Sequence, residues 1–110
     1  MLTYLVQASY ASHAIAALIK NPQNRTEHIR QCCEQFGGKL VGLWSSLGEH
    51  DIVCVFNMPD HIGAGAMRSV LASTGALKHV YLTPLYEVED GIKALKLAAT
   101  SIYKPVTVSA

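Results

Sequence analysis

The sequence carries little charge. Lys, Arg, Asp and Glu make up 15% of the 110 residues, and nine basic against eight acidic side chains leave a formal net charge of +1. Soluble domains average about 25% charged residues. A nearly neutral chain lacks the basic surface that binds nucleic acid or anionic membranes, so we expect neither as a partner. Because half the residues are hydrophobic, we expect a homo-oligomer, a dimer or larger, that buries part of this surface.

The sequence also lacks a disulfide framework and a long apolar run. Its three cysteines, Cys32, Cys33 and Cys54, are odd in number, and two are adjacent; neighbouring cysteines bridge each other only with strain. The apolar opening at residues 2–8 has no basic segment before it and is too short for a signal sequence or a membrane span. We therefore predict a protein of the reducing cytoplasm.

Motifs for metal, phosphate and nucleophilic chemistry are missing as well. The five histidines are far apart, with no H-x-x-H, H-E-x-x-H or C-x-x-C spacing. No G-x-S-x-G, P-loop or G-x-G-x-x-G motif follows a predicted strand. We expect no metal and no cofactor.

Hydrophobic periodicity predicts four strands and four helices. The strands are expected at 2–8, 39–47, 52–57 and 77–87, and the helices at 13–20, 24–36, 61–73 and after residue 90. Ser12, Asp60 and Asp90 are the predicted N-caps, while Gly37-Gly38 and Gly75 are predicted helix ends. We expect Ile62, Ala66 and Val70 to form the inner stripe of the third helix, with Met67 beside them.

This order of elements predicts a fold of the α+β class. Two βαβ units joined by a hairpin form the ferredoxin-like βαββαβ arrangement, a four-stranded antiparallel sheet with helices on one face. We assign residues 1–88 to this domain and residues 89–110 to a C-terminal helix and tail. The run from Ile52 to Phe56 does not alternate apolar with polar side chains, so both sheet faces need cover. A second subunit, the C-terminal helix or a ligand would cover the open face.

Two histidines and a carboxylate are the candidate catalytic groups. His50 lies between Glu49 and Asp51 in the predicted hairpin, where flanking carboxylates would suit proton transfer near neutral pH. The alternative interpretation is a solvated turn in which Asp51 binds backbone amides. His79 begins the last strand, in phase with Tyr81.

Aromatic side chains are the candidate walls of a ligand pocket on the open face. The candidate ligand-binding residues are Tyr4, Trp44, His50 and Tyr81. Trp44, the single tryptophan, fits ordinary packing or a subunit contact equally well.

The hairpin region resembles the GYD-domain family. The resemblance is carried by Gly-Gly-Lys-Leu-Val-Gly at 37–42 and Leu-Gly-Glu-His-Asp-Ile-Val at 47–53, supported by Tyr-Leu-Val at 4–6, Gly75 and Thr83. It covers residues 2–88 and implies a ferredoxin-like fold of the dimeric α/β-barrel superfamily, with little indication of chemistry. His50 stands where the family usually has tyrosine. The hairpin is also similar to the effector-binding domain of the leucine-responsive regulator family, without a DNA-reading segment before it.

Three functions are consistent with these observations. The first is a homo-oligomer that binds a small molecule at the open sheet face or the subunit interface. The second is a small cofactor-independent enzyme, a monooxygenase or isomerase, with His50 or His79 as acid or base. The third is a structural oligomeric module without a ligand.

Overall fold

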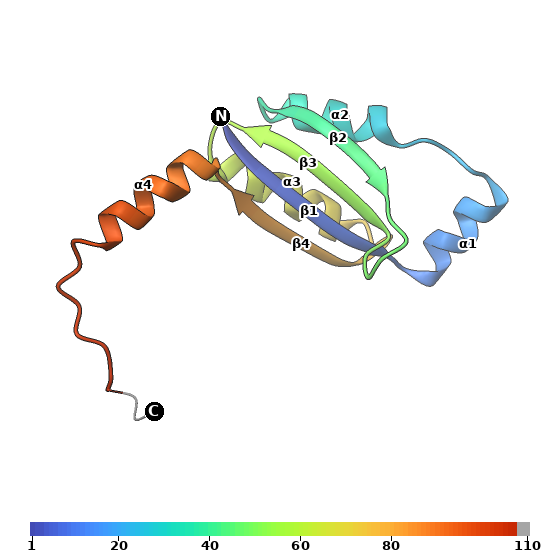
Figure 1. The fold of residues 1–110 in the computed structure, drawn as a ribbon. Helices are drawn as coiled ribbons and strands as arrows, with labels where there is room; N and C mark the ends of the chain where they lie inside the picture. The colour runs from blue at the N-terminus through green and yellow to red at the C-terminus, as the bar shows by residue number, and fades with distance from the viewer. Residues whose placement is uncertain (108–110) are drawn as a thin grey trace.

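The computed structural model describes residues 1–107 and contains one four-stranded antiparallel sheet with four helices (Figure 1). The elements are β1 (Leu2–Tyr10), α1 (Ser12–Lys20), α2 (Thr26–Gln35), β2 (Lys39–Ser45), β3 (Ile52–Met58), α3 (His61–Ser73), β4 (Leu77–Leu85) and α4 (Val88–Ala98). The strand order β2-β3-β1-β4 is that of the ferredoxin-like fold, so the predicted class is confirmed. Residues 108–110, the end of the predicted tail, lie outside the described residues.

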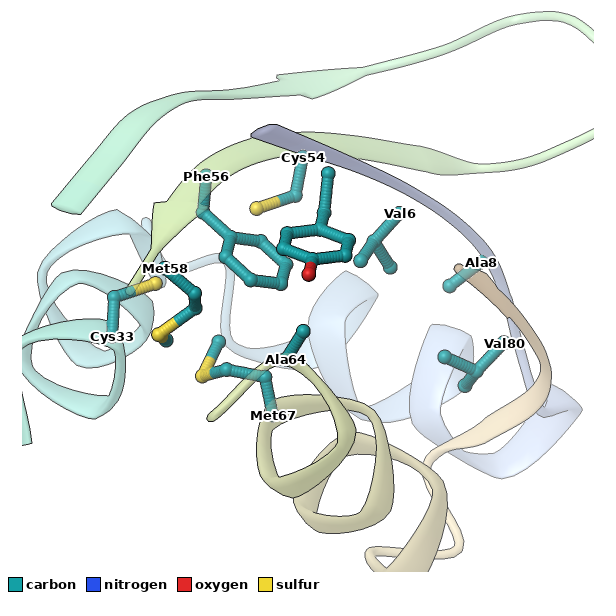
Figure 2. Packing of buried hydrophobic residues seen from close by; sticks show 10 residues of the cluster. Val6, Ala8, Cys33, Cys54, Phe56, Met58, Ala64, Met67 and Val80 are labelled. Atoms are coloured by element: carbon teal, nitrogen blue, oxygen red, sulfur yellow. The ribbon is translucent and has the colours of Figure 1, made fainter. Parts of the chain in front are cut away.

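The core lies between the sheet and helices α2 and α3. Strand side chains from β1, β3 and β4 point toward Cys33 of α2 and toward Ala64 and Met67 of α3, as Figure 2 shows. Phe56, Met67 and Cys33 are completely buried. Burial alternates along β1 and β3, so one face of the sheet forms this core and the other carries the residues between.

The turn that ends α2 depends on the two glycines at positions 37 and 38. Gly37 has φ +84°, a conformation that favours glycine. Its N–H donates to the carbonyl of Glu34 at 3.0 Å, and the N–H of Gly38 donates to that of Cys33 at 2.9 Å. These two bonds are the Schellman motif, which satisfies the last carbonyls of the helix. The predicted helix end is confirmed.

Two of the three predicted N-caps are wrong. Asp60 caps α3 as predicted, accepting a hydrogen bond from the N–H of Gly63 at 3.1 Å. Ser12 is instead the first residue of α1, and Asp90 lies within the first turn of α4. Both helices begin one or more residues earlier because the extended residues Ala11 and Glu87 occupy the cap positions without a side-chain bond.

The inner stripe of α3 also differs from the prediction. Ile62 and Val70 are exposed, whereas Gly63, Ala64 and Met67 are buried. The reason is a close approach of α3 to β3, since a Cβ at position 63 would lie 3.0 Å from the sulfur of Met58. Small residues allow this contact, so the bulkiest apolar side chains do not mark the buried face.

The buried thiols make the fold sensitive to alkali. Burial, with a smaller contribution from Cys33, raises the pKa of the Cys54 thiol from 9.0 to about 12. Burial also raises the pKa of Cys33 to about 11, with Cys32 and Glu34 adding to the effect. An acid whose pKa is higher in the folded state stabilises the fold below its unfolded pKa and loses this contribution as pH rises through its folded pKa.

We therefore expect the free energy of unfolding to fall as the pH rises from 9.0 towards 12. Denaturant titrations across this range measure the effect, with Cys54→Ala as the matched variant. The variant is expected to be less stable at neutral pH, because it loses buried volume, and to show a shallower alkaline decline. An identical decline in both proteins would contradict the assignment to Cys54.

Candidate functional site

The open face of the sheet is defined here as the strand side chains that point away from α2 and α3. The strand register places Leu5 between Val55 and Thr83, and Gln7 between Val53 and Tyr81. The apolar members of this face are half-buried or exposed, in contrast to the core residues beside them. The face is therefore an apolar surface that no helix covers within residues 1–107, as the non-alternating strands predict.

Trp44 lies on this open face. A bulge between Leu40 and Gly42 directs Leu40 toward the core and leaves Gly42 and Trp44 on the opposite side, paired with Val55 and Val53. A Cβ at Gly42 would lie 2.5 Å from the indole. The indole therefore lies over Gly42, and 53% of Trp44 is exposed.

His50, Tyr81 and His79 form an aromatic cluster on the same side. The ring centroids of His50 and Tyr81 are 5.3 Å apart, and those of His79 and Tyr81 are 6.2 Å apart. Nδ1 of His50 is buried and has no hydrogen-bond partner among the described residues. The structure thus brings together three of the residues selected from the sequence.

Asp51 forms hydrogen bonds with the backbone of β1. Its Oδ2 accepts a hydrogen bond from the N–H of Tyr10 at 2.8 Å, and its own N–H donates to the carbonyl of Ala8 at 2.9 Å. These bonds hold the hairpin loop against the end of β1. They match the second interpretation of the turn, in which the carboxylate binds a backbone amide.

The predicted position of Tyr4 is wrong. Tyr4 is buried on the helix side of the sheet, where its ring stacks on Phe56 with 5.5 Å between centroids. Tyr4 shares this face with Val6 and Ala8, two and four residues further along β1. It therefore does not join Trp44, His50 and Tyr81 on the open face.

A hollow of about 200 Å³ lies on the helix side of the sheet, and we name it the sheet–helix hollow. Its lining is mostly aliphatic and includes Val6, Ile29, Leu43, Leu71 and Leu77. A second cavity of about 520 Å³ adjoins it and is lined by the α1–α2 connection, by β2 including Trp44, and by Tyr10, Thr26 and Ile52. Such an apolar chamber with a few polar groups at one end is typical of small-molecule sites.

Tyr10 and Arg25 lie where the two cavities meet, since both residues line both cavities. Burial and the carboxylate of Asp51 raise the pKa of Tyr10, partly offset by the Arg25 guanidinium. The phenol therefore stays protonated and is a hydrogen-bond donor. Arg25 donates to Oε1 of Gln23 at 3.1 Å, and a guanidinium has five N–H donors in all.

No sequence motif indicated this hollow, and neither Tyr10 nor Arg25 is among the candidate residues selected from the sequence. The available signal was the 21–25 connection, in which Asn21-Pro22 ends α1 and residues 23–25 lead to the start of α2 at Thr26. Residues 1–107 contain no group of three His, Cys, Asp or Glu side chains placed to bind an ion.

Among the described residues, no helix has both the length and the apolar character needed to cross a membrane. No curated protein matches the sequence. Among solved structures, an uncharacterized NIPSNAP domain protein from Burkholderia xenovorans is similar, with 17% identity, 79% of this chain and 94% of that chain covered, and a TM-score of 0.47. The GYD domain matches residues 4–95, which reach into α4. The match covers most of the sequence, and the chain belongs to the GYD domain family.

Proposed function

We propose that the protein is a homo-oligomer that binds a small amphiphilic molecule in the sheet–helix hollow. The single observation that supports this most strongly is the aliphatic chamber of about 200 Å³ with Tyr10 and Arg25 at its polar end. An alkyl chain would replace water against Ile29, Leu71 and Leu77, and burial of each methylene stabilises by about 0.8 kcal/mol. The ligand position differs from the sequence-based expectation, which placed it on the open face.

The polar end of the hollow favours an anionic head group. The protonated phenol of Tyr10 and the guanidinium of Arg25 are both donors, and charged donors form the stronger hydrogen bonds. Arg25 binds a carboxylate through two parallel N–H groups with good geometry. A short-chain or medium-chain carboxylate therefore matches both ends of the cavity.

We propose that a second copy of the chain packs against the open face. Leu5, Val53 and Val55 form an apolar row there, with Trp44 at its side. Exposed apolar patches of this kind mark protein interfaces. The low charge of the whole chain also supports a subunit interface.

The enzyme alternative has less support. His50 and His79 belong to the aromatic cluster on the open face, and neither lines the sheet–helix hollow or the adjoining cavity. The titratable groups that line the hollow include Tyr10 and Cys54, and both have raised pKa values that keep them protonated. Neither of these protonated groups can act as the general base that a monooxygenase or isomerase would need.

Replacing Arg25 tests the head-group assignment. We expect Arg25→Gln to weaken binding of octanoate about tenfold, the loss typical of one charge-assisted hydrogen bond, and to leave binding of octanol unchanged. Titration calorimetry measures both ligands. Arg30→Gln is the matched control, because Arg30 lies within α2, lines neither cavity and pairs with Glu27 at 3.8 Å.

Equal octanoate affinity in wild type and Arg25→Gln would contradict the head-group assignment alone. Absence of binding of both octanoate and octanol to the wild type would contradict the function itself.

A further inference from the structure

Helix α4 has an apolar stripe that the rest of residues 1–107 leaves uncovered. None of its eleven residues is buried, and Figure 1 shows it projecting away from the sheet. Val88, Ile92 and Leu95 are 80%, 47% and 72% exposed. An isolated helix of this length is marginal in water, and helices in proteins owe most of their stability to packing of one face. A partner surface that covers this stripe would stabilise the helix.

The stripe and its flank have a defined pattern. Val88, Ile92, Leu95 and Ala99 follow one another at helical spacing and lie on one side. A groove of about 540 Å³ runs beside them, lined in part by Gly91 and Ala98. A row of large apolar residues thus runs beside a row of small ones, which suits close contact with another helix.

Charged side chains at the two ends of α4 have opposite signs. Glu89 and Asp90 lie in the first turn and Lys96 in the last, so the helix is acidic at one end and basic at the other. Lys93 already pairs with Asp90 at 3.8 Å, whereas Glu89 and Lys96 form no ion pair within the described residues. Glu89 and Lys96 are seven residues apart and therefore border the stripe on the same side.

We propose that α4 pairs antiparallel with α4 of a second copy of this chain. In an antiparallel pair the same flank of each helix meets, so Glu89 of one copy faces Lys96 of the other, twice by symmetry. The same register places Ile92 against Leu95 and Val88 against the small Ala99. A parallel pair would instead bring the acidic first turns together, and like charges repel.

The α4 pair is a second contact besides the open face. An 11-residue helix is about 16 Å long, which is too short to bury the roughly 1,200–2,000 Å² of a stable interface on its own. The contact therefore strengthens or extends an assembly made elsewhere on the molecule. It does not depend on the sheet–helix hollow or on its ligand.

Charge reversal in the full chain tests the pairing. Glu89→Lys and Lys96→Glu, each alone, place like charges opposite each other, and we expect each to weaken self-association about tenfold in sedimentation experiments. The double variant Glu89→Lys/Lys96→Glu restores opposite charges and is expected to associate like the wild type. An equimolar mixture of the two single variants is expected to form mixed assemblies, because both of its cross-pairs are then attractive.

The controls separate this contact from the open face and from misfolding. Circular dichroism and the unfolding midpoint check that each variant is folded. Leu95→Asp, in the stripe itself, is expected to weaken association more than either charge reversal, whereas Lys104→Glu, outside the helix, is expected to have no effect. Failure of the double variant and of the mixture to recover association would overturn the antiparallel pair. Unchanged association in Leu95→Asp would overturn any role of α4 in assembly.

Discussion

Leu5→Arg is expected to abolish self-association through the open face. Leu5 lies at the centre of this face, between Val55 and Thr83, and symmetric pairing through the face would bury two copies of the new charge. An unpaired charge buried at an interface costs several kcal/mol. We expect the dissociation constant to rise at least about a hundredfold, measured as subunit number by sedimentation against protein concentration.

Trp44 supplies an independent optical measurement of the same interface. The single tryptophan is 53% exposed on the open face, so face-to-face assembly would shield its indole from water. We expect its fluorescence emission to shift to longer wavelength in Leu5→Arg. Ile19→Arg, which places the same charge on the exposed side of α1, should leave both measurements unchanged. Wild-type behaviour of Leu5→Arg would show that the open face is not the interface.

Gly38→Ala is expected to have the largest effect on stability. A Cβ at this position would lie 2.3 Å from the carbonyl oxygen of Asn57 and 2.6 Å from the sulfur of Met58. The first neighbour is backbone of β3 and the second is completely buried, so neither moves without disturbing the sheet. We expect the free energy of unfolding to fall by about 2–4 kcal/mol, measured by denaturant titration.

Gly65→Ala is the matched control for this glycine. A Cβ at Gly65, within α3, meets nothing within 4 Å. Alanine is favoured over glycine in a helix by about 0.8–1.0 kcal/mol, so this variant is expected to be more stable than the wild type. Equal effects of the two substitutions would show that the close approach of Gly38, in the α2–β2 connection, to β3 does not limit stability.

Local sequence patterns predicted the fold because they report on strands and turns directly. The apolar segments at β1 and β3, the Schellman glycines after α2 and the Asp60 cap each specify an element with little help from distant residues. The buried face of α3 depended on a distant contact, that of Gly63 with Met58. Hydrophobic periodicity along the sequence does not reveal such a contact, so Ile62 and Val70 were wrongly predicted to be buried.

The sequence predicted candidate site residues on the open face of the sheet but did not predict the sheet–helix hollow. Trp44, His50, His79 and Tyr81 share the open face because strand alternation and the hairpin are local features. The sheet–helix hollow is formed by residues from six helices and strands and from two connections between them. Its polar end, Tyr10 and Arg25, comes from segments with no motif, so their proximity appears only in three dimensions.

Native mass spectrometry with added octanoate tests the central proposal most directly. The wild-type protein is expected to appear as assemblies of two or more subunits, with up to one octanoate bound per subunit. Ala8→Leu enlarges a side chain at the floor of the sheet–helix hollow and is expected to keep the assembly and lose the ligand. Ala16→Leu, the same change on exposed α1, is expected to keep both. Single subunits without octanoate in the wild type, or equal octanoate binding by Ala8→Leu, would contradict the account.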